Sequence, residues 1–331
     1  MKRMFRGEHP FQKAGVCTMA LRPGKLKRGD KAGIIAPASP PDLANLKKAV
    51  PFFEETLGLE LVFGKRIENQ YGYLAGRDEE RADDVMDMFL DPDIKAVFCA
   101  CGGYGTARIA DMLDFEAIRR NPKIFWGYSD ITYLHTAIRQ RAGLVTFHGP
   151  MLASDIGKKE VHSQTKHSFK QLFSGDKLCY TEALNELDVL VEGKAEGELV
   201  GGNLCLITSS LGTKNELDTD GKILFIEDVH EEPRNIDRYL NQLWNAGKLQ
   251  KIAGLVIGDF SDGEPERAKT LTLEEVLNHY AALIGKPAMS GFMIGHCDPH
   301  FAIPLGTSAT IDTTSKMLMV ESGVANERNK Y

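Results

Sequence analysis

The chain has 331 residues, of which 43% are hydrophobic and 26% are charged, with 32 glycines and 14 prolines. These are ordinary globular values, and the length suggests two domains, since one domain takes roughly 150 residues. The formal net charge of -6 argues against nucleic acid as the main partner.

The N-terminus is basic and carries no recognisable export signal. Residues 1–28 contain eight lysines and arginines but a single acidic residue, Glu8. We predict that residues 1–18 form a basic, flexible extension ahead of the first domain. No segment has the apolar length of a signal-peptide core or a membrane-spanning helix. We therefore expect a cytoplasmic protein whose six cysteines are reduced thiols.

Short apolar strands alternate with helices over residues 19–175, the predicted N-terminal domain. The predicted elements are, in order, a strand within 31–39, a helix over 42–57, a strand over 59–65, a helix over 78–90, a strand within 94–105 followed by a helix, a strand from 123, a helix from 129 and a strand from 144. Because these strands are apolar on both faces, they predict a parallel sheet covered by helices.

The second half is predicted to be richer in strands. A helix over 159–173 ends the first domain, and the polar stretch at 176–196 is the predicted linker. The C-terminal domain, 197–331, opens with a strand, a Gly-Gly turn and a short helix, and has an amphipathic helix over 234–246. Further strands are predicted at 222–228, 252–260, 287–296, 307–313 and 316–322. The fold class is therefore α/β, with a smaller β-rich second domain.

The turns that follow the strands of the first domain should meet at one rim, because functional loops gather at the carboxyl ends of parallel strands. These turns are Pro37–Ser39, Gly102–Gly105, Tyr128–Asp130 and His148–Pro150. The turn CGGYG has no phosphate-loop motif, but its two adjacent glycines let the backbone approach a ligand and present N–H groups. The GGN segment at 201–203 permits the same interpretation.

Ser129 lies at the bend between a strand and a helix. This layout is typical of a nucleophile elbow, in which a sharp turn exposes the serine hydroxyl and the first N–H groups of the helix face a developing oxyanion. However, Ile131 occupies the position of the second glycine in the usual GxSxG motif. A Ser-Asp pair before a helix is also a common N-cap. The local pattern leaves both roles open.

Two further residues could take part in catalysis. Glu227 ends a predicted strand, where a carboxylate either orients a catalytic histidine or is a rim charge. His296 follows the apolar segment FMIG. The ordinary pKa of histidine lies close to neutrality, which suits a general base, but a hydrogen-bonded loop histidine fits the same pattern.

Two patterns resemble metal sites. HCDPH places His296, Asp298 and His300 at alternate positions, and Glu227 and His230 are three residues apart. The Glu-x-x-His arrangement of carboxylate-bridged sites requires a helix, whereas this glutamate ends a predicted strand. The sequence also lacks HExxH and paired cysteines. We therefore predict no metal.

Six motifs follow one another along residues 20–322. They are GGYG at 102–105, NPKIFWGYSDIT at 121–132, FHGPM at 147–151, GGNLCLITSSLGT at 201–213, LFIEDVHEEPRNIDRYLNQL at 224–243 and GHCDPHFAIPLG at 295–306. Taken together and in this order, they resemble the LD-carboxypeptidase family of serine peptidases. The best-known members are the muramoyl-tetrapeptide carboxypeptidases of peptidoglycan recycling.

The resemblance implies a catalytic triad and a flavodoxin-like N-terminal domain, with the active site between the two domains. In the triad, Ser129 is the nucleophile, Glu227 orients the imidazole and His296 is the general base. The family also implies an oxyanion hole of backbone N–H groups, matched here by Gly102 or Gly103 and by Asp130. It implies no cofactor and suggests a homodimer.

The activity implied by the resemblance is cleavage of the L,D peptide bond to the terminal D-alanine of murein tetrapeptides. Relatives that hydrolyse a peptidyl-nucleotide antibiotic in self-immunity share the triad, so they are an alternative. A non-catalytic α/β protein that binds a small molecule is another. Many members carry an arginine where this chain has Cys101, which points to a difference in specificity. The residue that binds the substrate carboxylate is left open, with Arg77 and Arg234 as candidates.

Overall fold

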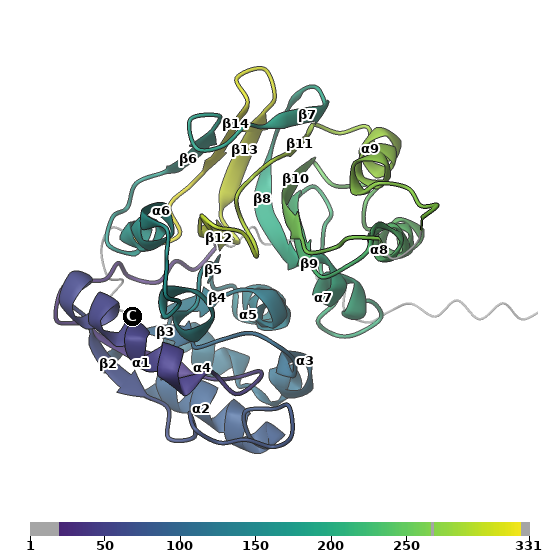
Figure 1. Cartoon of the computed structure of the whole chain (residues 1–331). Helices are drawn as coiled ribbons and strands as arrows, with labels where there is room; N and C mark the ends of the chain where they lie inside the picture. The colour runs from purple at the N-terminus through teal and green to yellow at the C-terminus, as the bar shows by residue number, and fades with distance from the viewer. Residues whose placement is uncertain (1–19, 266–267, 326–331) are drawn as a thin grey trace, which may run out of the picture.

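The chain folds into two domains, each built on its own sheet. The computed structural model describes residues 20–265 and 268–325. The predicted extension at 1–18 lies outside the described residues. Figure 1 shows the first half of the chain, purple to teal, below the second half, green to yellow. The predicted fold class is confirmed.

The first sheet has six strands in the order β12-β5-β4-β3-β1-β2. Strands β1 to β5 are parallel, and their order is that of flavodoxin-like folds. Strand β12, from the second half of the chain, pairs antiparallel with β5. The bounds are β1 Lys31–Ile35, β2 Glu60–Phe63, β3 Ile94–Cys99, β4 Ile124–Gly127, β5 Thr146–His148 and β12 Ile303–Leu305.

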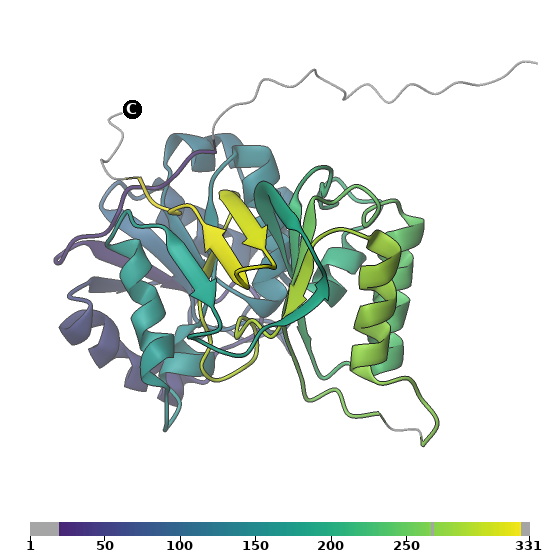
Figure 2. The ribbon, with the colours of Figure 1, turned by 90° about the horizontal axis from the view of Figure 1, so that it is seen from above.

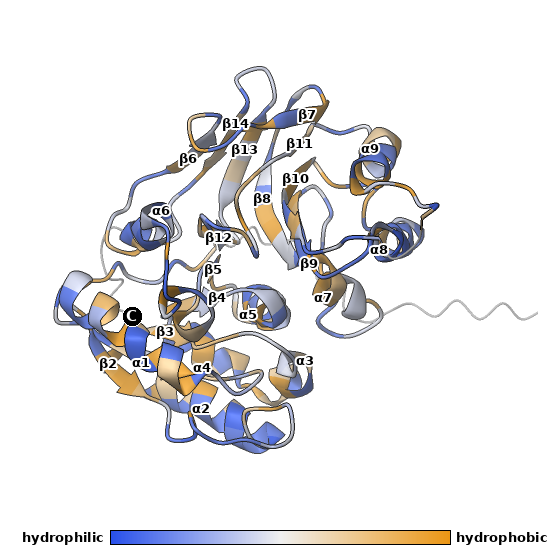
Figure 3. Cartoon of the chain, viewed as in Figure 1, coloured by the Kyte–Doolittle hydropathy of each residue, from blue (hydrophilic) through white to orange (hydrophobic). Residues whose placement is uncertain are grey.

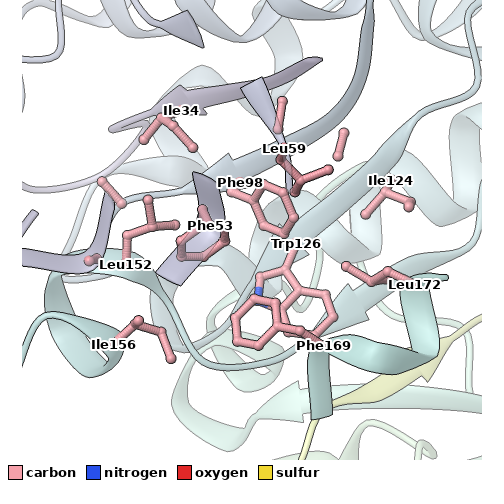
Figure 4. Packing of buried hydrophobic residues seen from close by; sticks show 14 of the residues in the cluster. Ile34, Phe53, Leu59, Phe98, Ile124, Trp126, Leu152, Ile156, Phe169 and Leu172 are labelled. Atoms are coloured by element: carbon pink, nitrogen blue, oxygen red, sulfur yellow. The ribbon is translucent and has the colours of Figure 1, made fainter. Parts of the chain in front are cut away.

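Both faces of the first sheet are buried, as predicted from its apolar strands. Consecutive residues of a strand point to opposite faces, and in β4 both Phe125 and Trp126 are fully buried. On one face, Trp126 stacks on Phe169 with ring centroids 4.5 Å apart, and Phe53 and Phe98 lie in the same cluster (Figure 4). The other face is covered by α2 to α5. The helices are α1 Leu43–Pro51, α2 Asp78–Leu90, α3 Thr106–Ile109, α4 Phe115–Arg120, α5 Thr132–Ala142 and α6 Ser163–His167.

The helix boundaries follow local chemistry where a cap is present. The side chain of Asp42 accepts hydrogen bonds from the N–H groups of Ala44 and Asn45, which fixes the start of α1. Helix α2 has the predicted bounds. The helix predicted over 159–173 begins later, with α6 at Ser163, and continues as a 3-10 helix to Leu172.

The second sheet has eight strands in the order β6-β14-β13-β8-β9-β10-β11-β7. Its centre, from β8 to β11, is parallel, and both flanks are antiparallel. The bounds are β6 Leu178–Thr181, β7 Asp188–Val191, β8 Lys194–Asn203, β9 Ile223–Val229, β10 Gly254–Ser261, β11 Ala288–Ser290, β13 Ser308–Asp312 and β14 Met317–Val320. The stretch 176–196, predicted as a linker, thus contains β6, β7 and the start of β8. The domain boundaries stay a prediction.

Helices cover one face of the second sheet. They are α7 Leu204–Ser209, α8 Pro233–Asn245 and α9 Leu273–Ile284. Figure 2 shows α8 and α9 on the side of this sheet away from the first domain. The opposite face packs against residues of β12, so the two domains share a buried contact. Figure 3 shows hydrophobic strands in the first sheet and hydrophilic segments on α2 and α8. No helix in the two described ranges is long and apolar enough to cross a membrane.

Candidate active site

The four turns predicted to share a rim do so. The N–H of Ser39 donates to the carbonyl of Gly102 at 3.2 Å, which joins the turns after β1 and β3. The N–H of Gly149 donates to the carbonyl of Gly127 at 3.1 Å, which joins the turns after β4 and β5. Loops from four strands therefore surround Ser129.

Ser129 occupies a strained elbow. It follows the end of β4 and opens a 3-10 turn, Ser129–Ile131, that leads into α5. Its φ is +63°, in the left-handed region that residues other than glycine rarely adopt. Its hydroxyl makes no hydrogen bond to any residue that the structure describes. This serine is half-buried, so its hydroxyl remains available to a ligand.

The alternative that the Ser-Asp pair caps the helix is wrong. Neither the 3-10 turn nor α5 has a side-chain cap. Instead, the buried carboxylate of Asp130 accepts the N–H of Thr106 at 2.8 Å, at the start of α3. Burial raises the pKa of Asp130, although hydrogen bonds from Thr106 and Gly105 oppose that rise. Asp130 therefore fixes the loop after β3 against the elbow.

Gly102 lies against the Ser129 side chain. A Cβ atom built on Gly102 would stand 3.0 Å from Ser129 Cβ and 3.2 Å from its Oγ, closer than most real contacts. The backbone thus approaches the hydroxyl where a side chain would interfere. The N–H groups of Gly102 and Gly103 have no acceptor in residues 20–265 or 268–325. Backbone donors of this kind beside a serine hydroxyl can stabilise a negatively charged oxygen.

Glu227 and His296 form a buried pair. His296 Nδ1 lies 2.8 Å from Glu227 Oε2, and the carboxylate is fully buried on β9. An Nδ1–H that donates to this carboxylate leaves Nε2 as the nitrogen that can accept a proton. Burial alone would lower the pKa of His296. The hydrogen bond and charge of Glu227, followed by the charges of Asp155 and Asp228, outweigh burial and raise this pKa above its usual value.

A chain of contacts brings this pair to the elbow. The hydroxyl of Thr132, three residues after Ser129, accepts the N–H of Asn203 at 3.0 Å. Asn203 is paired with Glu227 in the register of β8 and β9. The ring of Tyr128, directly before Ser129, lies 4.8 Å from the His296 ring, centroid to centroid. The residues that flank Ser129 thus contact the His296 ring and the strand partner of Glu227.

The Gly-Gly turn predicted at 201–202 is wrong, because both glycines lie within β8. These glycines allow neighbouring segments of the chain to pack closely against β8. A Cβ atom on Gly202 would stand 2.6 Å from Thr132 Oγ1, so only glycine lets the start of α5 contact this strand. The strand predicted over 287–296 is also shorter, since β11 ends at Ser290 and His296 lies on a loop.

Sequence reasoning missed two supporting carboxylates. Asp228 accepts Asn203 Nδ2 at 2.8 Å and the N–H of Cys205 at 2.9 Å. Burial, with the charge of Glu227, raises the pKa of Asp228 to about 7. Asp155 accepts the Tyr128 hydroxyl at 3.1 Å, and burial raises the pKa of Asp155. Asp228 directly follows Glu227 at the end of β9, and this adjacency was a local signal for it. No local signal identified Asp155.

The residues of the metal-like patterns do not converge. His296 bonds to Glu227, whereas the His300 ring is buried 4.5 Å from that of Tyr128, centroid to centroid. His230 is exposed, away from the fully buried Glu227. Within the described parts of the chain, no three His, Cys, Asp or Glu side chains are grouped as a metal ion requires.

Cys101 is a neutral thiol beside the site. Its Sγ lies 3.1 Å from the carbonyl oxygen of Ser39. Burial, with the nearby Asp130 carboxylate, raises the pKa of Cys101 to about 12. A thiolate nucleophile at this position is therefore disfavoured.

Both halves of the chain are similar to known proteins. The models of the LD-carboxypeptidase N-terminal domain and C-terminal domain match residues 32–149 and 196–311. A Bacillus subtilis (strain 168) protein named "probable murein peptide carboxypeptidase" is 56% identical over 312 residues, 94% of this chain and 98% of that protein. Muramoyltetrapeptide carboxypeptidase from Oxalobacter formigenes has a TM-score of 0.80 at 28% identity, covering 89% of this chain and 100% of its own. The microcin C7 self-immunity protein MccF has a TM-score of 0.85 at 26% identity, covering 92% and 100%.

Proposed function

The chain belongs to the LD-carboxypeptidase family, and from this premise we propose that it is a serine carboxypeptidase of murein tetrapeptides. It releases the terminal D-alanine from the diamino acid at the third position. The observation that carries this proposal is the buried Glu227–His296 pair near an elbow whose serine hydroxyl has no hydrogen-bond partner among the described residues.

The first chemical step is acylation. Ser129 Oγ attacks the carbonyl carbon of the L,D peptide bond while His296 Nε2 accepts the hydroxyl proton. Glu227 keeps Nδ1 protonated and stabilises the imidazolium that forms. The N–H groups of Gly102 or Gly103 and of Asp130 are suited to hold the oxyanion, each donor being worth about 3 kcal/mol of barrier.

Collapse of the tetrahedral intermediate breaks the C–N bond. His296 returns the proton to the leaving amine, and D-alanine departs. A water molecule then loses a proton to His296 and attacks the acyl ester. The tripeptide is released and the Ser129 hydroxyl is restored. A general base of raised pKa is well matched to proton transfer near neutral pH.

The two alternatives have less support. MccF shares the fold but is 26% identical, against 56% for the murein peptide relative. A protein that only binds a small molecule would have no need for a strained serine beside a buried acid–base pair. Covalent labelling of Ser129 by an activated-serine reagent separates an enzyme from a binding protein.

The decisive assay is D-alanine release from a murein tetrapeptide in the presence of EDTA. We expect release by the wild type and none by Ser129→Ala, with the two proteins equally folded by circular dichroism. Release that EDTA abolishes would contradict a metal-independent mechanism. Equal release by both proteins would exclude Ser129 as the nucleophile.

The location and assembly of the enzyme are also part of the proposal. The family resemblance supports a cytoplasmic homodimer in peptidoglycan recycling. Light scattering on the full chain, whose mass is 36.6 kDa, tests the dimer directly. A mass equal to one chain at micromolar concentration would contradict it.

A further inference from the structure

Three tyrosines are exposed together on the rim of the first domain. The exposed fractions are 52% for Tyr71, 65% for Tyr73 and 51% for Tyr104. Within the described ranges they are three of the four exposed large aromatic residues, the other being Phe63. The rings of Tyr73 and Tyr104 meet edge to face, with centroids 5.7 Å apart and planes at 67°. We call these three residues the tyrosine platform.

The platform is held firmly by backbone contacts. The N–H of Tyr104 donates to Ser39 Oγ at 3.1 Å. Tyr71 and Leu74 exchange backbone hydrogen bonds of 2.8 and 3.1 Å, and the N–H of Ala75 donates to the carbonyl of Ala38 at 2.9 Å. The loop after β2 is thus fixed against the turns after β1 and β3. A rigid aromatic surface loses little conformational freedom on binding a ligand.

The tyrosine hydroxyls are free to bind. In the parts of the chain that the structure describes, none of the three hydroxyls makes a hydrogen bond. Each hydroxyl can donate one hydrogen bond and accept others. The guanidinium of Arg77 lies over the ring of Tyr71, 4.8 Å from its centroid, so Tyr73 and Tyr104 offer the open ring faces. The platform therefore combines these apolar faces with unused polar groups, which suits an amphipathic ligand.

The connectivity of the chain limits the distance between the tyrosine platform and Ser129. Gly102 lies against Ser129, and Tyr104 follows Gly102 by two residues. The Cα atoms of Gly102 and Tyr104 are therefore at most about 7 Å apart. In an extended tetrapeptide the first residue lies roughly 10 Å from the bond to D-alanine. The amino sugar of a muramoyl peptide is attached beyond that first residue. Tyr104 therefore lies within the length of a muramoyl tetrapeptide from Ser129.

We propose that the tyrosine platform is a carbohydrate subsite that binds the amino sugar of muramoyl tetrapeptides. The inference rests on the proposed function and names the preferred substrate as the sugar-bearing peptide rather than the free peptide. The negative face of an aromatic ring attracts the polarised C–H groups on the face of a pyranose. The edge-to-face pair of Tyr73 and Tyr104 offers one ring to the sugar face and the other to its edge.

The test compares two substrates, free tetrapeptide and N-acetylglucosaminyl-N-acetylmuramoyl tetrapeptide, by D-alanine release. For Tyr73→Ala/Tyr104→Ala, we expect kcat/KM on the sugar-bearing substrate to fall about tenfold, through KM, as loss of aromatic stacking predicts. Activity on the free peptide should change by less than about twofold, because the free peptide lacks the amino sugar that the platform binds. Tyr73→Phe/Tyr104→Phe should retain most of the preference. Leu283→Ala, an exposed position on α9, is the matched control.

Other outcomes overturn the proposal. An equal loss on both substrates would assign the tyrosines to the peptide site or to folding. Unchanged kcat/KM on both substrates would leave the sugar without a contact at the tyrosine platform. A change in mass by light scattering would make the platform a subunit contact. If the wild type releases D-alanine from neither substrate, the proposed function fails. Calorimetric binding of the sugar-bearing peptide to Ser129→Ala, with and without the two tyrosine changes, then still tests the subsite.

Discussion

Glu227→Gln removes the buried charge that faces His296 and keeps the volume of the side chain. The carboxylate oxygen lies 2.8 Å from His296 Nδ1, so the centres of the two charged groups are about 4 Å apart during catalysis. At an effective dielectric constant of about 20, this attraction is worth about 4 kcal/mol. Its loss would slow acylation by about 10³-fold, and a hydrogen bond retained by the glutamine would reduce this to no less than about 10²-fold.

The pH profile gives a second readout of the same variant. His296 must be neutral to accept a proton, so activity rises with pH through its pKa. In the wild type the acid limb should lie above the ordinary histidine value of 6.5, because Glu227 outweighs burial. In Glu227→Gln, the burial of His296 still lowers its pKa, whereas the charge of Glu227 that opposed burial is gone. The acid limb of the profile should therefore move to lower pH. Measurement of kcat between pH 5 and about 9, with melting temperature as the control for folding, checks both effects. A well-folded variant with an unmoved limb and less than about tenfold loss would refute this reasoning.

Three other variants test the elbow, the oxyanion loop and the second carboxylate. The free energy of unfolding should be about 1 kcal/mol larger for Ser129→Gly than for Ser129→Ala, because a φ of +63° strains every residue but glycine. Denaturant titration of both variants measures this difference, and equal stabilities would argue against strain at Ser129. Gly102→Ala should lower kcat by about 10²-fold with an unchanged melting temperature, since the added Cβ would lie 3.2 Å from Ser129 Oγ. Normal kinetics would show that the loop accommodates the added Cβ without disturbing Ser129. The raised pKa of Asp228, about 7, means that the folded protein binds more protons than the unfolded chain above pH 3.8. Its contribution to the free energy of unfolding should therefore fall as pH rises from 3.8 to about 7, and Asp228→Asn should lack this component in denaturant titrations across that range.

Local pattern predicted the first domain well because its signals are short in range. The strand around Phe125 and Trp126 is apolar at every position, which is how a strand buried on both faces differs from an alternating one. Helix α2 begins and ends at the predicted residues. The position of Ser129 between a strand and a helix follows from the same signals. Each of these depends on neighbours within a few residues.

The candidate site itself required contacts across the chain. No sequence signal showed that the carboxylate of Glu227 turns inward to His296, or that Asp130 supports the loop of Thr106 rather than capping its own helix. The function of Gly202 as a place of close approach depends on Thr132, which arrives from the other domain. The resemblance to a family supplied the grouping of the triad residues, but not these contacts.

The sequence by itself determined which segments become strands and helices, and where the rim of the first sheet lies, because backbone propensity and hydrophobic periodicity act over a few residues. Tertiary structure alone decided that Leu178–Thr181 and Asp188–Val191 join the second sheet, and that β12 returns to the first. Pairing between strands depends on which edges are free and which faces remain to be buried. Those conditions exist only once the whole chain has packed.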